Sequence, residues 1–134
     1  IHHSFRSYVA IVIDVEVQDK DIKVHDAYVV LDCGTHINPD TCVAQMEGAV
    51  VFGLSLALKS EITFDKGSAV QGNLDTYELI RMMESPRVTV DLVQSEALPA
   101  GVGEPGVPPV APALTNAIFA ASGQRIRKLP VSLA

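Results

Sequence analysis

Residues 7–33 read SYVAIVIDVEVQDKDIKVHDAYVVLDC, and this stretch sets the expected architecture. Its first part, residues 7–18, is rich in β-branched residues and ends in an alternation of apolar and polar side chains. Asp19, Lys20 and Asp21 form a polar turn, and residues 22–33 are strand-like again. Two such runs joined by a short polar turn are typical of an antiparallel β-hairpin. His25 falls among the polar residues of the second run, which favours a solvated histidine over a metal ligand.

The sequence after this hairpin predicts a long helix. Asn38 is a favoured N-cap residue, Pro39 suits the first helical position, and Asp40 complements the positive end of the helix dipole. The helix is expected to continue to about Lys59, with one apolar face at helical spacing. We expect that face to contain Val43, Glu47, Val50, Leu54 and Leu58.

Small and polar residues interrupt this apolar helix. Gly48 and Gly53 each weaken an isolated helix by roughly 1 kcal/mol relative to alanine, so they predict close packing of another backbone or of a ligand. Gln45 and Glu47 lie near the first two turns. Simple surface polarity is an equally open interpretation of these two side chains.

The remaining segments complete an α+β pattern. A short second hairpin is expected around the turn at residues 65–67, a strand from Arg87 to Val93, and an Ala-rich helix over residues 108–122, capped by Gly123. Residues 129–131 are expected to form an extended tail. We predict a single domain over residues 1–134, with a mostly antiparallel sheet covered on one face by two helices.

Residues 101–112 read GVGEPGVPPVAP and present a carboxylate between glycine and proline. Gly101 and Gly103 allow another body to approach the main chain closely, and Pro105 restricts Glu104 to an extended conformation. An ordinary Gly/Pro-rich connector whose glutamate faces water is the competing interpretation.

Composition excludes some classes of protein. The chain has 134 residues and a net charge of -6, from 10 basic and 16 acidic residues, which argues against nucleic-acid binding. Cys33 and Cys42 match neither a disulfide framework nor a zinc-ligand spacing, so buried free thiols are expected. No apolar run is expected to span a membrane. No signal peptide is visible, and cytoplasm and periplasm both remain open.

Several motifs, in this order and spacing, carry a specific resemblance. They are Asp32-Cys33-Gly34, Asn38-Pro39-Asp40, Gln45 through Ala49, Gly53-Leu54-Ser55, Asn73 through Tyr77, Gly103-Glu104-Pro105, Asn116 through Ala121 and Arg125-Ile126-Arg127. Together they resemble the C-terminal part of the molybdenum-binding large subunit of the xanthine oxidase and aldehyde oxidase family. The resemblance is greatest to isoquinoline 1-oxidoreductase-type β subunits, and it covers essentially the whole chain.

This resemblance implies part of a hydroxylase that inserts water-derived oxygen at an electron-poor carbon of an N-heterocycle or aldehyde. By its place in the family's motif, Glu104 is the general base, a role for which a carboxylate must be ionised and within hydrogen-bond reach of the attacking oxygen. The resemblance also implies that Gln45 contacts the cofactor, through an amide that both donates and accepts hydrogen bonds. Gly103, in the Gly-Glu-Pro loop, is expected to bind the cofactor as well. Glu47 is expected to orient the helix.

The resemblance also implies cofactors and partners. The cofactor is molybdenum with molybdopterin, expected in the cytosine dinucleotide form and shared with the rest of the large subunit. Iron–sulfur clusters are expected on a [2Fe-2S] small subunit, since two cysteines cannot hold a cluster that requires four. The isolated chain is expected to be inactive. A non-catalytic folding or interaction module is the alternative, and an independent ligand-binding loop at residues 101–105 has little support.

Overall fold

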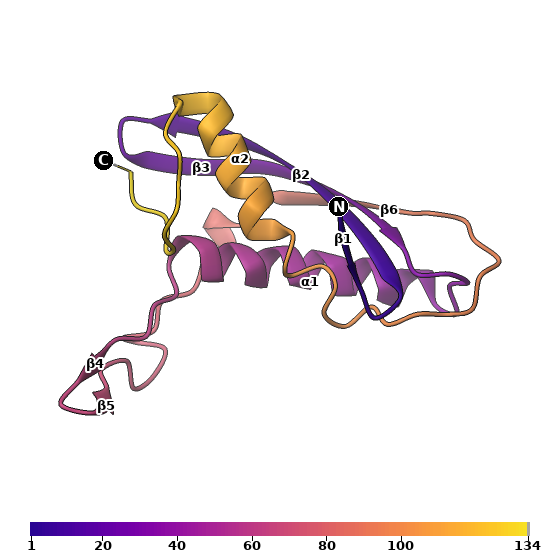
Figure 1. Cartoon of the computed structure of the whole chain (residues 1–134), viewed down its shortest axis with the longest axis horizontal. Coiled ribbons are helices and arrows are strands. Elements are labelled where there is room, and N and C mark those ends of the chain that lie inside the picture. The colour runs from indigo at the N-terminus through magenta and orange to yellow at the C-terminus, as the bar shows by residue number, and fades with distance from the viewer. Residues whose placement is uncertain (134) are drawn as a thin grey trace.

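The computed structural model describes residues 1–133 and shows a four-stranded sheet with two helices packed against it (Figure 1). The strand order in the sheet is β1-β2-β3-β6. The elements in chain order are β1 (His2–Ser4), β2 (Ser7–Gln18), β3 (Asp21–Asp32), α1 (Pro39–Leu58), β4 (Phe64–Asp65), β5 (Ser68–Ala69), the 3₁₀ turn η1 (Met82–Glu84), β6 (Arg87–Leu92) and α2 (Val110–Ser122).

The predicted long hairpin is confirmed as the antiparallel pair β2–β3, with Gln18 opposite Asp21. Its register shifts after Asp14, so that Val15 lies opposite Val24 and His25 is the extra residue of a bulge. The His25 side chain is half-buried, with Nε2 3.0 Å from Glu16 Oε2. His25 therefore pairs with a neighbouring strand residue, as expected for a histidine on the solvated side of a hairpin.

The sheet is mixed, because β6 pairs with β3 in parallel while the β1–β2 and β2–β3 pairings are antiparallel. The predicted α+β fold with a mostly antiparallel sheet is confirmed. An ion pair fixes the start of β6, where Arg87 Nε lies 2.6 Å from Asp26 Oδ1 on β3. The parallel position follows from the crossover through α1 and the segment after it, which carries the chain back to the same edge of the hairpin.

One hydrophobic core lies between the sheet and the helices. The sheet contributes residues that alternate along each strand, and both helices contribute residues at helical spacing. Its most deeply buried large side chains are Val9, Val29, Leu31, Met46, Val50, Leu54, Val110, Leu114 and Ile118. Cys33 and Cys42 are free and buried, as predicted.

The predicted apolar face of α1 is wrong in part. Val43 is only half-buried and Glu47 is exposed. The residues buried on α1 are Cys42, Met46, Ala49, Val50, Gly53, Leu54, Ser55 and Ala57. Val50 and Leu54 of the predicted face are buried as expected, whereas small residues beside them, such as Ala49 and Gly53, extend the face in a direction that a pattern of large hydrophobic residues does not reveal.

Gly53 lies where α1 and α2 cross. A Cβ atom at Gly53 would lie 2.7 Å from Cβ and Cγ2 of Val110, so the absence of a side chain lets the first turn of α2 approach. The expected close packing at Gly53 is therefore confirmed. Pro108 and Pro109 precede α2 and only Pro112 lies in its first turn, which corrects the predicted start at residue 108.

The end of α1 leads into segments on the periphery. The second predicted hairpin exists as the two-residue strands β4 and β5, joined by a turn with positive φ at Lys66 and Gly67. The expected C-terminal tail packs back on the fold, because Val131 N donates to Ala57 O at 2.8 Å and Leu133 is buried.

By length and composition alone, α1 could cross a membrane, contrary to the expectation that no apolar run is long enough. The same test is passed by core helices of folded domains, and a single such helix is weak support for a span. Here α1 packs its small-residue face against the core.

Candidate active site

The loop between β6 and α2 is tied to the turn between β1 and β2. Ser7 Oγ donates to Gly101 O at 2.7 Å, and Gly101 N donates to Phe5 O at 3.1 Å. A Cβ atom at Gly101 would lie 2.9 Å from Phe5 Cβ, so only glycine permits this approach. These contacts fix the main chain immediately before the Gly-Glu-Pro motif.

A second attachment comes from the segment after β3. Thr35 N donates to Ala97 O, and Ala100 N donates to Cys33 O, each at 2.9 Å. Gly34 has φ +73°, and a Cβ there would lie 2.3 Å from Leu98 O. The connection between β6 and α2 therefore packs directly on the Asp-Cys-Gly motif. The sequence signalled only that the strand ends here, and it did not identify the segment that packs on it.

Glu104 begins a tight turn whose far side packs on α1. Val107 N donates to Glu104 O at 3.0 Å, and the Pro105 side chain is fully buried. A Cβ atom at Gly106 would lie 2.7 Å from Ala49 Cβ and 3.0 Å from Met46 Sδ. Gly106 has no positive φ, so glycine is required there by the approach to the helix and not by backbone conformation. The buried proline and glycine hold the exposed glutamate on a fixed backbone.

The structure brings together the segments that carry the predicted site residues. A Cβ atom at Gly103 would lie 3.7 Å from Gln45 Nε2, so the loop and the second turn of α1 are neighbours. Gln45, Gly103 and Glu104 are all exposed. Gly48 follows Gln45 by one turn of α1, and a Cβ there would meet nothing within 4 Å. These residues form one open surface with the Gln45 amide, the Glu104 carboxylate and unobstructed backbone at Gly48.

Neither glutamate of the matched motifs has a partner inside the chain. Among residues 1–133, no hydrogen bond or ion pair involves the carboxylate of Glu104 or of Glu47. The expectation that Glu47 orients the helix therefore has no support from contacts of this chain. The Glu104 carboxylate is available to a group outside the chain.

Two thiols lie beneath this surface. Burial, as the largest cause, and the neighbouring Cys42 thiol together raise the pKa of the Cys33 thiol from 9.0 to about 11. A thiol that stays protonated is a poor nucleophile and a poor metal ligand. Within the described part of the chain, no three His, Cys, Asp or Glu residues are grouped so as to hold a metal ion.

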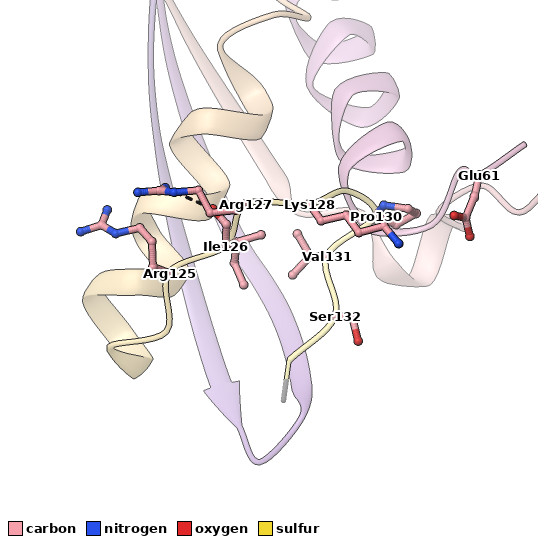
Figure 2. A pocket seen from close by; sticks show the side chains of 8 residues that line it. All are labelled: Glu61, Arg125, Ile126, Arg127, Lys128, Pro130, Val131 and Ser132. Carbon is pink, nitrogen blue, oxygen red and sulfur yellow. Dashed lines mark hydrogen bonds between the residues drawn. The ribbon is translucent and has the colours of Figure 1, made fainter.

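A separate hollow lies away from these residues. A cavity of about 460 Å³ opens beside the C-terminal segment and is lined by Glu61, residues 125–128 and residues 130–132 (Figure 2). Arg125 and Arg127 project to the same side of this segment (Figure 2). The Arg125 guanidinium stacks on Phe119, with Cζ 3.5 Å from the centre of the ring. None of the predicted site residues lines this cavity.

The family model described as a molybdopterin cofactor-binding domain matches residues 2–86 of the chain. The chain belongs to this family. The match includes Gln45 and Gly48 but ends before the Gly-Glu-Pro loop, whose place beside Gln45 comes from the structure.

Known proteins resemble the chain over most of its length. Isoquinoline 1-oxidoreductase subunit beta of Brevundimonas diminuta is 34% identical over 127 residues, which is 93% of this chain and 16% of that protein. Membrane-bound aldehyde dehydrogenase [pyrroloquinoline-quinone] of Gluconacetobacter polyoxogenes is 41% identical over 103 residues, or 77% of this chain and 13% of that protein. The name of the second relative mentions pyrroloquinoline quinone, whereas the description of the family model mentions molybdopterin.

Solved structures share the fold of this domain. Carbon monoxide dehydrogenase of Oligotropha carboxidovorans aligns with a TM-score of 0.68 at 26% identity, covering 77% of this chain and 14% of that one. Quinoline 2-oxidoreductase of Pseudomonas putida 86 aligns with a TM-score of 0.68 at 24% identity, covering 82% of this chain and 15% of that one. The chain therefore spans only 13–16% of the length of these two curated relatives.

Proposed function

We propose that this chain forms one wall of the active site of a molybdenum-dependent hydroxylase or dehydrogenase. The reaction inserts water-derived oxygen at an electron-poor carbon of an N-heterocycle or an aldehyde. The observation that carries the proposal is the convergence of Gln45, Gly103 and Glu104 on one open surface in a chain of the molybdopterin-binding family.

The residues present fit such a cofactor. The Gln45 amide can donate and accept hydrogen bonds without adding charge. Gly48 and Gly103 leave the backbone on either side of it open to a large ligand, since a Cβ at either position would meet no atom closer than 3.7 Å. Because no cluster of metal-ligating side chains lies in residues 1–133, these contacts fit the organic part of the cofactor.

When bound, the cofactor supplies the metal centre that activates the oxygen and accepts two electrons from the substrate. Gln45 and the Gly103 backbone orient the cofactor against α1. Glu104 accepts the proton of the attacking oxygen, which requires an ionised carboxylate within hydrogen-bond distance. The rigid turn from Glu104 to Val107 limits how far the carboxylate can move, and pre-positioning of this kind lowers the barrier.

The proposal extends to the assembly. The pterin is in the cytosine dinucleotide form, the rest of the large subunit holds most of it, and a small subunit with [2Fe-2S] clusters removes the electrons. The isolated chain neither retains the cofactor nor turns over substrate, because it presents only one side of the surface.

The test is a Glu104→Gln variant of the whole complex. Turnover should fall by about 10²–10⁴-fold, the usual contribution of a positioned general base, while molybdenum content stays at the wild-type level. Glu47→Gln is the matched control, because Glu47 is also an exposed, unpaired glutamate near the site, and it should retain activity. Near-normal turnover of the Glu104→Gln variant would contradict the proposal that Glu104 is the general base.

A further inference from the structure

A slender arm, residues 60–80, projects from the end of α1 away from the sheet and carries β4 and β5 (Figure 1). It is fastened at its base, where Ser60 Oγ donates to Glu78 O at 3.0 Å and Ile80 N donates to Ser55 Oγ at 3.2 Å. Beyond the base, hydrogen bonds join arm residues to one another, as between Thr63 and Gln71. The arm is a formed element that the body of the domain does not cover.

Large apolar side chains on the arm face solvent. Phe64 is 73% exposed and Leu74 is 68% exposed. Ile62, Val70 and Leu79 are exposed as well, and none of the five belongs to the hydrophobic core. An isolated two-stranded hairpin is at best marginally stable in water. Ile62 and Leu74 line one shallow hollow on the arm, and exposed apolar surface of this kind marks an interaction site. The arm therefore lacks a contact that would bury these side chains.

The rest of a longer polypeptide is the candidate for this contact. The family model spans residues 2–86 and so includes the arm, which makes the arm a regular part of the domain. A regular element requires an occupant that is present wherever the domain occurs. The matched relatives have more than four-fifths of their length outside the region aligned with this chain. That length is sufficient to cover the arm.

We propose that the arm docks, through Phe64 and Leu74, on the part of the same large subunit that lies outside this chain. The chemistry of the docking surface follows from the arm. Within residues 60–80 the arm has four acidic residues and one basic residue, Lys66. The acidic residues are Glu61, Asp65, Asp75 and Glu78. The receiving surface is accordingly apolar at its centre and carries basic or hydrogen-bond donor groups at its rim. The inference rests on the proposed function only in assuming a large subunit.

The test places a photoreactive benzoylphenylalanine at position 64 in the assembled complex. Irradiation should give a cross-link within one polypeptide, mapped by mass spectrometry to residues of the large subunit outside residues 1–134. A cross-link to a small subunit or to a second copy of the large subunit would overturn the proposal, as would the absence of any cross-link. Molybdenum content of the same sample tests the proposed function separately, because docking requires no metal.

A pair of variants provides a second measurement. Phe64→Ser in the complex should speed hydrogen exchange at the backbone amides of the arm, because it removes the largest side chain from the contact. Lys66→Asn is the control, since asparagine tolerates the positive φ at the tip of the hairpin and no apolar contact is lost. Equal exchange in both variants and the wild type would contradict docking through Phe64.

Discussion

At the scale of single residues, the most informative positions are glycines with different surroundings. Gly101 and Gly106 are required by the approach of Phe5 and of α1, whereas a Cβ at Gly48 would meet no atom within 4 Å and one at Gly103 would meet only Gln45 Nε2, at 3.7 Å. The first pair fixes the loop, and the second pair leaves room for a ligand beside Gln45. The sequence placed Gln45 and Glu104 in a site through resemblance alone, and their proximity became visible only when the loop was seen packed on α1.

A residue-scale prediction concerns Cys33, whose pKa is raised to about 11 in the folded chain. Because the folded state holds the thiol proton more tightly than the unfolded state, this contribution to stability is complete below pH 9 and is lost as pH rises toward 11. The loss is at most about 1.4 kcal/mol per pH unit. Urea unfolding of wild type and Cys33→Ala under reducing conditions should show a steeper decline in this window for the wild type. Parallel curves would contradict the raised pKa.

At the scale of elements, the sequence predicted the hairpin, both helices and the Asn38 N-cap, whose Oδ1 accepts from Thr41 N at 3.1 Å. These features depend on local chemistry. The buried face of α1 was predicted only in part, because small residues such as Ala49 and Gly53 make up much of it beside Val50 and Leu54. The parallel pairing of β6 was missed because it depends on a crossover that no local pattern encodes.

An element-scale prediction compares two glycines of α1. Gly48→Ala should raise the free energy of unfolding by up to about 1 kcal/mol, because the helix gains propensity and the new Cβ meets nothing within 4 Å. Gly53→Ala should lower it, since overpacking against Val110 costs about 1–3 kcal/mol and outweighs the same gain. Urea denaturation measures both. Equal effects of the two alanines would contradict the packing at Gly53.

At the scale of the whole molecule, the chain is a folded domain whose proposed site and proposed docking arm are both left uncovered. Its core is continuous, yet the site presents one side only, and the arm carries unburied apolar side chains. The hydrophobic content of 48% agrees with surfaces that pack against another body. The direction of the arm could not be predicted, because a hairpin signal gives the turn and not its orientation to the body.

The central claim is that this chain works as part of a molybdenum enzyme, and metal content tests it most directly. We would measure molybdenum and iron by elemental analysis in the complex that co-purifies with the chain from its native host. The account predicts molybdenum together with iron. A stable complex with neither metal, or with a quinone cofactor in their place, would contradict it and would remove the roles assigned to Gln45 and Glu104.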